Sequence, residues 1–174
     1  MSEIIYIGVG SKIEPERNLI QALDLLRMQI RIEALSTCYR SVALRRTEQA
    51  DYINCVWQGV TDLDASTVKF SVLRKVESAL GRIRTADTYA ARTIDLDLLL
   101  YGTFCVQSRD LTVPDPDIMR RVFIARPLLE LAPEITIPGM RLPLAQLEVS
   151  QPNESLVALH DLTTKLKARL QYEP

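Results

Sequence analysis

Hydrophobic and polar positions follow two different periods along the chain, one typical of strands and the other of helices. Residues 3–11 (EIIYIGVGS) form a short apolar run that ends in glycines, which predicts a strand leading into a turn. Between Glu14 and Gln29, apolar residues recur three, four and seven positions apart, which predicts an amphipathic helix with Pro15 in its first turn. Together these segments predict a β-α unit.

The middle of the chain predicts two further strands and a second helix. Residues 31–44 and 51–63 are rich in β-branched and aromatic residues, and the loop between them is too long and too charged for a tight hairpin. A helical pattern follows, with Asp64 or Ser66 as its N-cap and Gly81 at its end. This part of the chain therefore predicts the order β-β-α.

A basic loop leads into residues 92–102 (RTIDLDLLLYG), whose length and composition predict a strand. The complete order, β-α-β-β-α-β, is that of the split-βαβ, ferredoxin-like α+β fold, an antiparallel sheet with helices packed on it. Beyond it, we expect a proline-rich loop at residues 112–121 and a short helix at residues 126–132. A polar break lies near residues 151–153, and residues 154–170 predict a last helix.

Length and composition favour one globular domain. The chain has 174 residues, 47% of them hydrophobic and 25% charged, which is enough to bury a core. We expect one main domain over residues 1–150, and a helical extension packed on it over residues 151–174. A net charge of −1 provides no overall field to attract nucleic acid or an anionic membrane, so we expect neither as a partner.

The cysteine and histidine content narrows the chemistry further. Cys38, Cys55 and Cys105 are scattered and odd in number, which fits free thiols in a reducing cytoplasm better than disulfides or a zinc site. His160 is the only histidine, so a zinc centre or a histidine-based catalytic triad would be hard to build. With no signal peptide and no apolar run near ~18 residues, we expect a cytoplasmic protein, and we expect a monomer.

Two aspartates, Asp95 and Asp97, interrupt one of the most apolar stretches of the chain. In a strand they share one face, while Ile94, Leu96 and Leu98 point the other way. Two carboxylates ~6 Å apart repel each other by ~3 kcal/mol at an effective dielectric constant of 20. Mg²⁺ removes this repulsion, because it binds a pair of carboxylates together with waters and substrate phosphates. Two acids on a solvent-facing strand edge explain the spacing equally well.

Basic residues on both sides of the pair favour the metal interpretation. Arginine binds phosphate oxygens bidentately, while a metal ion neutralises the same polyphosphate. The combination predicts phosphoryl transfer by positioning and charge stabilisation, without a protein nucleophile. The alternative is that the arginines only pair with Glu77, Asp87 and Asp95. The basic residues concerned are Arg74, Lys75, Arg82, Arg84, Arg92, Arg120, Arg121 and Arg126.

The segment RTIDLDLLLYG and the later LTVPDPDIMRRVFIARPLLELAPE together resemble the 6-hydroxymethyl-7,8-dihydropterin pyrophosphokinases of folate biosynthesis. The segments YIGVGS, DYINCV and ALGRIR fall in that family's order and spacing, so the resemblance covers about residues 3–140. It implies a ferredoxin-like fold. It also implies transfer of the terminal pyrophosphate of ATP to the hydroxymethyl group of the pterin, which leaves AMP.

The resemblance also implies roles for individual residues. Asp95 and Asp97 are expected to hold two Mg²⁺ ions on the phosphates of ATP, the co-substrate. Arg82 and Arg92 are expected to be the catalytic residues that hold the β- and γ-phosphoryl oxygens. The implied pterin contacts are Ser41, Leu44, Tyr52, Asn54 and Phe123, and the implied nucleotide contacts are Glu77, Arg84, Leu98, Thr112, Asp115 and Arg121.

Several positions depart from the usual pattern of that family. Lys12 stands where the first turn usually has asparagine, and Asp115 stands where a histidine is usual. Because pocket positions have changed while the phosphate-binding positions have not, two alternatives remain open. One is a paralogue that acts on a different small alcohol, and the other is a non-catalytic nucleotide- or pterin-binding protein. The other departures are Ser41, Val42, Ala43, Thr85, Tyr89, Ala90 and Ala91.

Overall fold

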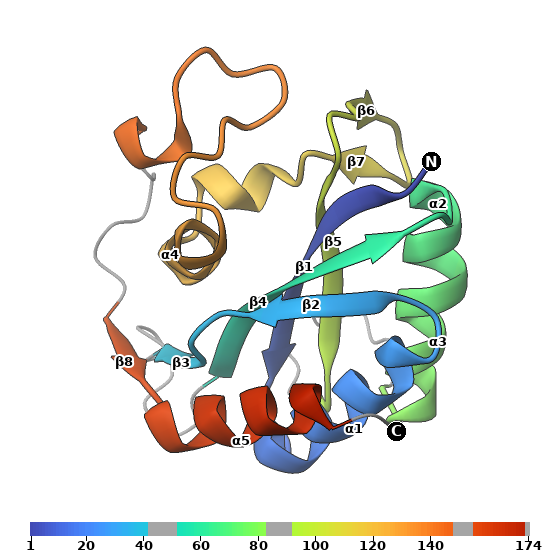
Figure 1. The fold of residues 1–174 in the computed structure, drawn as a ribbon, viewed down its shortest axis with the longest axis vertical. Helices are drawn as coiled ribbons and strands as arrows, with labels where there is room; N and C mark the ends of the chain where they lie inside the picture. Colours follow the sequence, from blue (N-terminus) through green and yellow to red (C-terminus); the bar gives the residue numbers. More distant parts are fainter. Residues whose placement is uncertain (42–51, 83–91, 148–154, 173–174) are drawn as a thin grey trace.

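The computed structural model describes residues 1–41, 52–82, 92–147 and 155–172 (Figure 1). Its first half contains β1 (Glu3–Ser11), α1 (Pro15–Arg27), β2 (Arg31–Leu35), β3 (Tyr39–Ser41), β4 (Tyr52–Thr61), α2 (Ala65–Thr67), the π-helical turns η1 (Val68–Leu73) and α3 (Arg74–Ala79). Its second half contains β5 (Asp95–Tyr101), β6 (Val106–Gln107), β7 (Thr112–Val113), the 3₁₀ turn η2 (Pro116–Met119), α4 (Val122–Leu131), the 3₁₀ turn η3 (Leu144–Gln146), β8 (Leu156–Ala158) and α5 (His160–Gln171).

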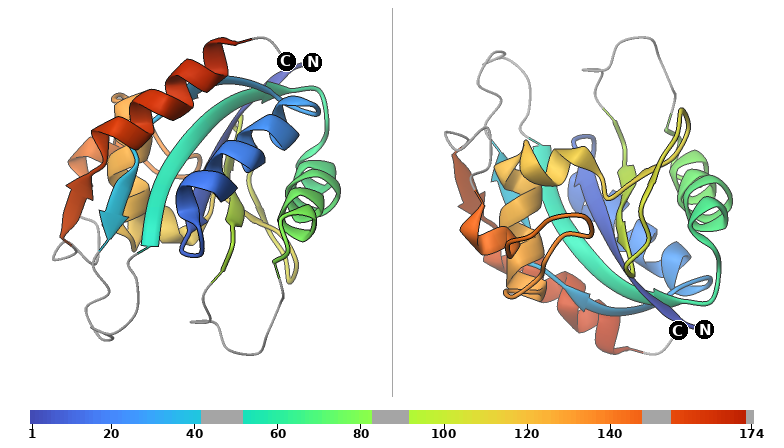
Figure 2. Two further views of the ribbon diagram at one scale, coloured as in Figure 1. Left: turned by 90° about the horizontal axis from the view of Figure 1, so that it is seen from below. Right: turned by 90° about the horizontal axis from the view of Figure 1, so that it is seen from above.

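The main sheet is antiparallel and has the strand order β5-β1-β4-β3-β8, with β2 also paired to β4. The two central strands, β1 and β4, pair along their length from Glu3 opposite Thr61 to Ser11 opposite Ile53. The helices α1, α3 and α5 cover one face of the sheet, and α4 covers part of the other (Figures 1 and 2). The ferredoxin-like α+β prediction is confirmed by this order.

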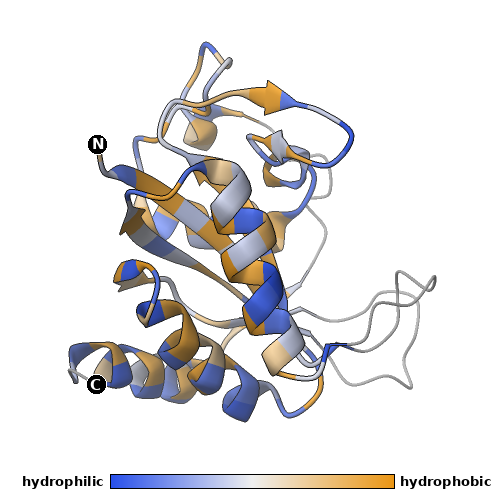
Figure 3. Ribbon diagram, turned by 90° about the vertical axis from the view of Figure 1, so that its right-hand side faces the viewer, coloured by the Kyte–Doolittle hydropathy of each residue, from blue (hydrophilic) through white to orange (hydrophobic). Residues whose placement is uncertain are grey.

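Each face of the sheet has its own hydrophobic core. Alternate residues of β1, including Ile5 and Ile7, pack with Trp57, Leu96 and the apolar sides of α1, α3 and α5. The smaller core lies under α4 and contains, among others, Val56, Leu99, Leu100, Ile118, Leu128, Ile137 and Leu144. Figure 3 shows the alternation of hydrophobic and hydrophilic residues along the helices that this two-sided packing requires.

The helix predicted to end at Gly81 forms as three consecutive segments, α2, η1 and α3. Asp64 is its N-cap, because the carboxylate of Asp64 accepts a hydrogen bond from the backbone N–H of Thr67 at 3.0 Å. Of the two N-caps predicted, Asp64 is therefore the one that forms. Gly81 follows with a φ of 73°, a conformation that glycine adopts without strain.

Three predicted elements differ from the structure. The strand expected over residues 31–44 is interrupted after Leu35, and β3 begins at Tyr39. The proline-rich loop contains β7 and η2, and the short helix after it begins at Val122 rather than residue 126. The helix expected over residues 154–170 begins only at His160, because the preceding residues form β8.

The C-terminal part of the described chain belongs to the same packing unit as the rest. β8 pairs with β3, and the side chains of Leu162 and Leu166 on α5 enter the larger core. The proposed boundary near residue 150 lies outside the described residues and stays a prediction. In the part of the chain that the structure describes, no helix has the length and apolar character needed to cross a bilayer.

Candidate active site

The candidate site lies on the face of the sheet opposite α1, α3 and α5, where two glycines of β1 form its floor. Gly10 pairs with Asp95 of β5 on one side and with Asn54 of β4 on the other. A Cβ atom at Gly10 would lie 3.0 Å from the side-chain oxygen of Asn54 and 3.8 Å from the Cβ of Asp95. Glycine therefore allows an acidic and an amide side chain to approach each other over β1. Gly8 occupies the equivalent position between Asp97 and Val56.

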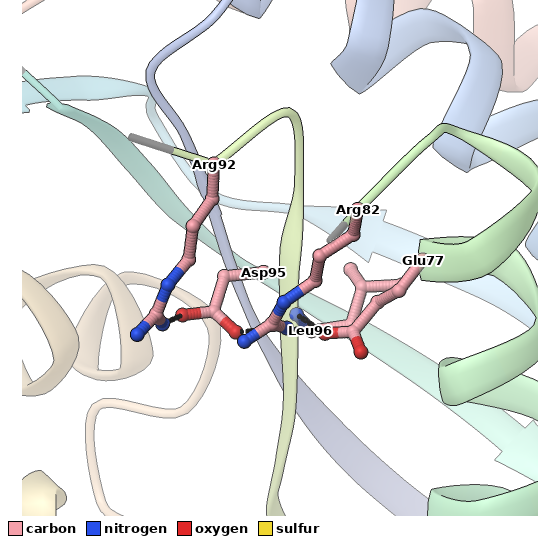
Figure 4. A network of polar contacts seen from close by, with 5 residues as sticks. All are labelled: Glu77, Arg82, Arg92, Asp95 and Leu96. Carbon is pink, nitrogen blue, oxygen red and sulfur yellow. Dashed lines mark hydrogen bonds and ion pairs between the residues drawn. The ribbon is translucent and has the colours of Figure 1, made fainter. Parts of the chain in front are cut away.

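Asp95 is the centre of a network of charged side chains (Figure 4). One of its carboxylate oxygens accepts a hydrogen bond from Arg82, and the other accepts one from Arg92. Arg82 also donates to Glu77, whose carboxylate accepts a second bond, of 2.9 Å, from the backbone N–H of Leu96. The two predicted catalytic arginines thus lie beside one predicted metal ligand. The sequence also allowed these arginines simply to pair with acidic residues, and the structure contains such pairs with Glu77 and Asp95.

Asp97 has an unusual electrostatic environment. Loss of solvation raises the pKa of its carboxyl group to about 7, and the negative charges of Asp95, Asp115 and Glu77 act in the same direction. The side chain nevertheless keeps contact with solvent, so a cation can reach it. Asp95 and Asp97 share the face of Gly10 and Gly8, as predicted, while Leu96 and Leu98 are buried in the larger core.

These two carboxylates fit Mg²⁺ better than a metal held by protein groups alone. Among the described residues, no cluster of three or more histidine, cysteine or acidic side chains has metal-binding geometry. Mg²⁺ commonly uses one or two carboxylates and completes its coordination shell with water and phosphate oxygens. Loss of solvation and repulsion from neighbouring carboxylates raise the pKa of Asp97, and a bound divalent cation would offset both effects.

The predicted pterin contacts lie toward β4 and β3. Asn54 is 8% exposed, and its amide donates a 3.0 Å hydrogen bond to the hydroxyl of Ser41. Tyr52 is half-buried and lies opposite Ser41 in the β3–β4 pairing. Phe123 lies in the first turn of α4, the helix that packs against β4. Leu44 lies outside the described residues. The structure thus brings Ser41, Tyr52 and Asn54 together on two neighbouring strands.

The predicted nucleotide contacts have more varied positions. Arg121 is the residue before α4, and its guanidinium lies 5.9 Å from the centroid of the Phe123 ring. Thr112 is half-buried on β7. The side chain of Leu98 is buried in the larger core, so only its main chain, on the outer strand of the sheet, is available to a nucleotide. Glu77 is 2% exposed and bound to protein groups. Arg84 lies outside the described residues.

Asp115 lies at the start of η2, close enough to Asp97 for its charge to act on that carboxyl group. Its carboxylate accepts a 2.8 Å hydrogen bond from the backbone N–H of Asp117, and its own N–H donates to the carbonyl of Leu99 at 2.9 Å. Burial raises the pKa of its carboxyl group, while the charges of Lys69 and Arg120 lower it. Its charge is therefore partly offset, but it still acts on Asp97.

Asp115→His is expected to tighten binding of MgATP about three- to tenfold at low ionic strength, because it removes a negative charge near the phosphates. The gain should shrink as salt rises. Asp115→Asn is the matched variant, since asparagine removes the charge and can still cap η2. Calorimetric titration at two salt concentrations measures both. Unchanged or weaker binding in both variants would show that Asp115 does not oppose the nucleotide.

Gly8 and Gly10 are site residues that the motifs and the family resemblance do not identify. The available signal was the spacing of Gly8 and Gly10, two positions apart in a predicted strand and therefore on one face. In the sequence, Lys12 is only a departure from the family pattern, whereas in the structure this residue is 8% exposed.

Comparison with known proteins agrees with this geometry. Residues 6–133 match the family model of 7,8-dihydro-6-hydroxymethylpterin-pyrophosphokinase (HPPK). A 2-amino-4-hydroxy-6-hydroxymethyldihydropteridine pyrophosphokinase of Haemophilus influenzae is 32% identical over 140 residues, which cover 79% of this chain and 86% of that protein. The chain belongs to the HPPK family. A second relative with the same name, from Aquifex aeolicus, is 32% identical over 143 residues, or 82% of this chain and 88% of the relative.

Solved structures show the same fold at low sequence identity. A crystal structure of an HPPK-DHPS in complex with substrates superposes with a TM-score of 0.62 at 10% identity, covering 83% of this chain. An HPPK-DHPS structure from Plasmodium falciparum superposes with a TM-score of 0.64 at 12% identity, covering 98% of this chain. This HPPK-family chain matches only 42% and 46% of those two longer chains.

Proposed function

We propose that the protein transfers the terminal pyrophosphate of ATP to the hydroxymethyl group of 6-hydroxymethyl-7,8-dihydropterin, which produces AMP and the pterin diphosphate. The observation that carries this proposal is the arrangement around Gly10 in a chain of the HPPK family. Asp95 with its two arginines lies on one side of this glycine, and Asn54 lies on the other. The groups that we propose to bind phosphate and pterin are thus neighbours on one surface.

Asp95 and Asp97 would hold Mg²⁺, and we expect two ions. When bound, Mg²⁺ would supply positive charge that neutralises the phosphate oxygens of ATP. Arg82 and Arg92 lie beside Asp95, and we expect them to stabilise the charge of the phosphoryl group as it redistributes. Glu77 holds Arg82 and the edge of β5 in place and thereby acts on the nucleotide indirectly.

Asn54, Tyr52 and Ser41 would hold the pterin, with Phe123 contributing a ring from α4. An amide can match the donor and acceptor edge of a pterin, because it carries both kinds of group. In the reaction, the hydroxymethyl oxygen forms a bond to the β-phosphorus. The bond between that phosphorus and the oxygen shared with the α-phosphate breaks, and the hydroxyl proton is released. This chemistry needs positioning and charge stabilisation, and no covalent protein intermediate.

Release of AMP from MgATP, with and without 6-hydroxymethyl-7,8-dihydropterin, tests the proposal directly. We expect AMP release to depend on the pterin and to match formation of the pterin diphosphate. AMP release stimulated only by another small alcohol would support the paralogue. Binding of ATP and pterin without turnover would support the non-catalytic alternative and overturn the proposed function.

We further propose that the protein works as a cytoplasmic monomer with ATP and the pterin as its small-molecule partners. Its near-neutral net charge of −1 supports the absence of a nucleic-acid partner. Light scattering of the purified protein with both ligands tests the monomeric state, which a stable dimer mass would contradict.

A further inference from the structure

Lys12 lies between the two halves of the proposed site. In the pairing of β1 with β4, Gly10 is opposite Asn54 and Ser11 is opposite Ile53. Continuing this register by one residue places Lys12 opposite Tyr52. Because residues two apart share a face, Lys12 lies on the same side of the sheet as Gly10. On this face, Lys12 and Tyr52 therefore form the row next to the row of Asp95, Gly10 and Asn54.

The side chain of Lys12 contacts the pterin side of the site. Its ammonium nitrogen lies 5.1 Å from the centroid of the Tyr52 ring, within the range of a cation–π interaction. The residue is only 8% exposed. A lysine loses solvation and side-chain freedom in such a position, so the contact has to provide a compensating interaction. An asparagine at this position, usual in the family, would be too short to make it.

The main chain of Lys12 contacts the phosphate side. The backbone N–H groups of Lys12 and Ile13 both donate to the carbonyl oxygen of Arg92, each at 3.1 Å. The neighbouring hydroxyl of Ser11 donates to the carbonyl of Thr93 at 2.5 Å. The turn after β1 therefore holds the segment that carries Arg92. Lys12 contacts Arg92 through its main chain and Tyr52 through its side chain.

We propose that Lys12 is a positioning residue for the pterin, acting through Tyr52. Its ammonium fixes the ring of Tyr52, while its main chain fixes the segment of Arg92. The inference rests on the proposed function, because it assigns Tyr52 to the pterin side. It adds to the pterin side of the site a residue, Lys12, at which this chain differs from the usual family pattern. Pterin binding would then depend on a protein cation that need not contact the substrate.

Lys12→Met tests this role, since methionine removes the charge and keeps an unbranched apolar side chain. We expect pterin binding, in the presence of a non-hydrolysable MgATP analogue, to weaken about fivefold, the change that corresponds to ~1 kcal/mol of cation–π energy. Binding of the MgATP analogue alone should change less than about twofold, because the main-chain bonds to Arg92 do not involve the side chain. Lys12→Arg retains a cation over the ring and should restore pterin binding.

Fluorescence titration of the pterin and calorimetric titration of the MgATP analogue provide the two affinities. If Lys12→Met weakened the binding of both ligands equally, Lys12 would have a general structural role and the proposal would be overturned. An unchanged pterin affinity would overturn it as well. Lys12→Gln serves the same comparison if the methionine variant does not fold. A wild-type protein that binds no pterin would overturn the proposed function itself, an outcome visible before any variant is compared.

A double-mutant cycle with Tyr52→Leu decides whether Lys12 acts through the ring. Tyr52→Leu alone should weaken pterin binding, since it removes a proposed pocket residue. If Lys12 acts by fixing this ring, adding Lys12→Met to the Tyr52→Leu variant should cause little further loss. A further loss as large as in the wild-type background would mean that Lys12 contacts the substrate directly, and the positioning role would be wrong.

Discussion

Asp97→Asn is expected to lower kcat on the order of a thousandfold while raising the melting temperature of the metal-free protein at pH 8. Activity falls because the variant loses one of the two carboxylates proposed to fix Mg²⁺ on the phosphates. Stability rises because the substitution removes a carboxylate that is repelled by Asp95, Asp115 and Glu77. Steady-state kinetics with MgATP and thermal unfolding in EDTA measure the two effects.

The stability gain should depend on pH in a defined direction. The pKa of Asp97 in the folded protein is about 7, above its ordinary value of 3.8. A raised pKa means that the folded state binds this proton more tightly than the unfolded state, so stability is lost as pH rises toward and through 7. Asp97→Asn and wild type should therefore melt alike below pH ~4 and differ most above pH ~7. A difference that is constant with pH would contradict this environment for Asp97.

Asp95→Asn is the matched variant and should behave differently in stability. It should also abolish most activity. Unlike Asp97→Asn, it removes a carboxylate that forms ion pairs with Arg82 and Arg92. We therefore expect its melting temperature to fall. Repulsion between the two carboxylates alone would predict a small rise for either substitution, but the two ion pairs of Asp95 restrict that rise to Asp97. Near-normal activity with Mg²⁺ in either variant would overturn the metal-binding role.

Arg82→Ala and Arg92→Ala are expected to lower kcat about a hundredfold or more while raising KM for ATP less. The charge on the transferring group changes most in the transition state, so a donor beside it acts mainly on the chemical step. Arg121→Ala is the control, because this arginine lies at the start of α4 and is proposed to contact the nucleotide only. It should mainly raise KM. Steady-state kinetics at saturating pterin separate the two patterns.

Arg82→Ala and Arg92→Ala should differ in their effect on stability. Arg82 is 10% exposed and Glu77 is 3% exposed at the side chain, so Arg82→Ala leaves a buried carboxylate without its cation and should cost about 3 kcal/mol. Arg92 and Asp95 are 25% and 21% exposed, so loss of Arg92 should cost about 1 kcal/mol. Chemical denaturation checks both values. If all three arginine variants raised KM without lowering kcat, the arginines would only bind an anion and would have no part in the chemical step.

The sequence by itself determined the β-α-β-β-α-β order of the main elements and the common face of Asp95 and Asp97. Both follow from local periodicity, because a strand alternates its faces every residue and an amphipathic helix repeats its apolar face every turn. The alternation also placed Leu98 on the opposite face, which the structure confirms. The family pattern in the sequence then selected Arg82, Arg92 and Asn54, residues that periodicity alone could not assign.

Only the tertiary structure decided how residues distant in the chain meet. In the folded protein, the carboxylate of Glu77 accepts a hydrogen bond from the backbone N–H of Leu96, β8 pairs with β3, and the ammonium of Lys12 lies over the ring of Tyr52. The residues before His160 have a helical period in sequence, yet they form a strand because the edge of β3 offers them hydrogen-bond partners. Such contacts depend on strand register and packing between segments far apart in sequence, and local propensity carries no information about either.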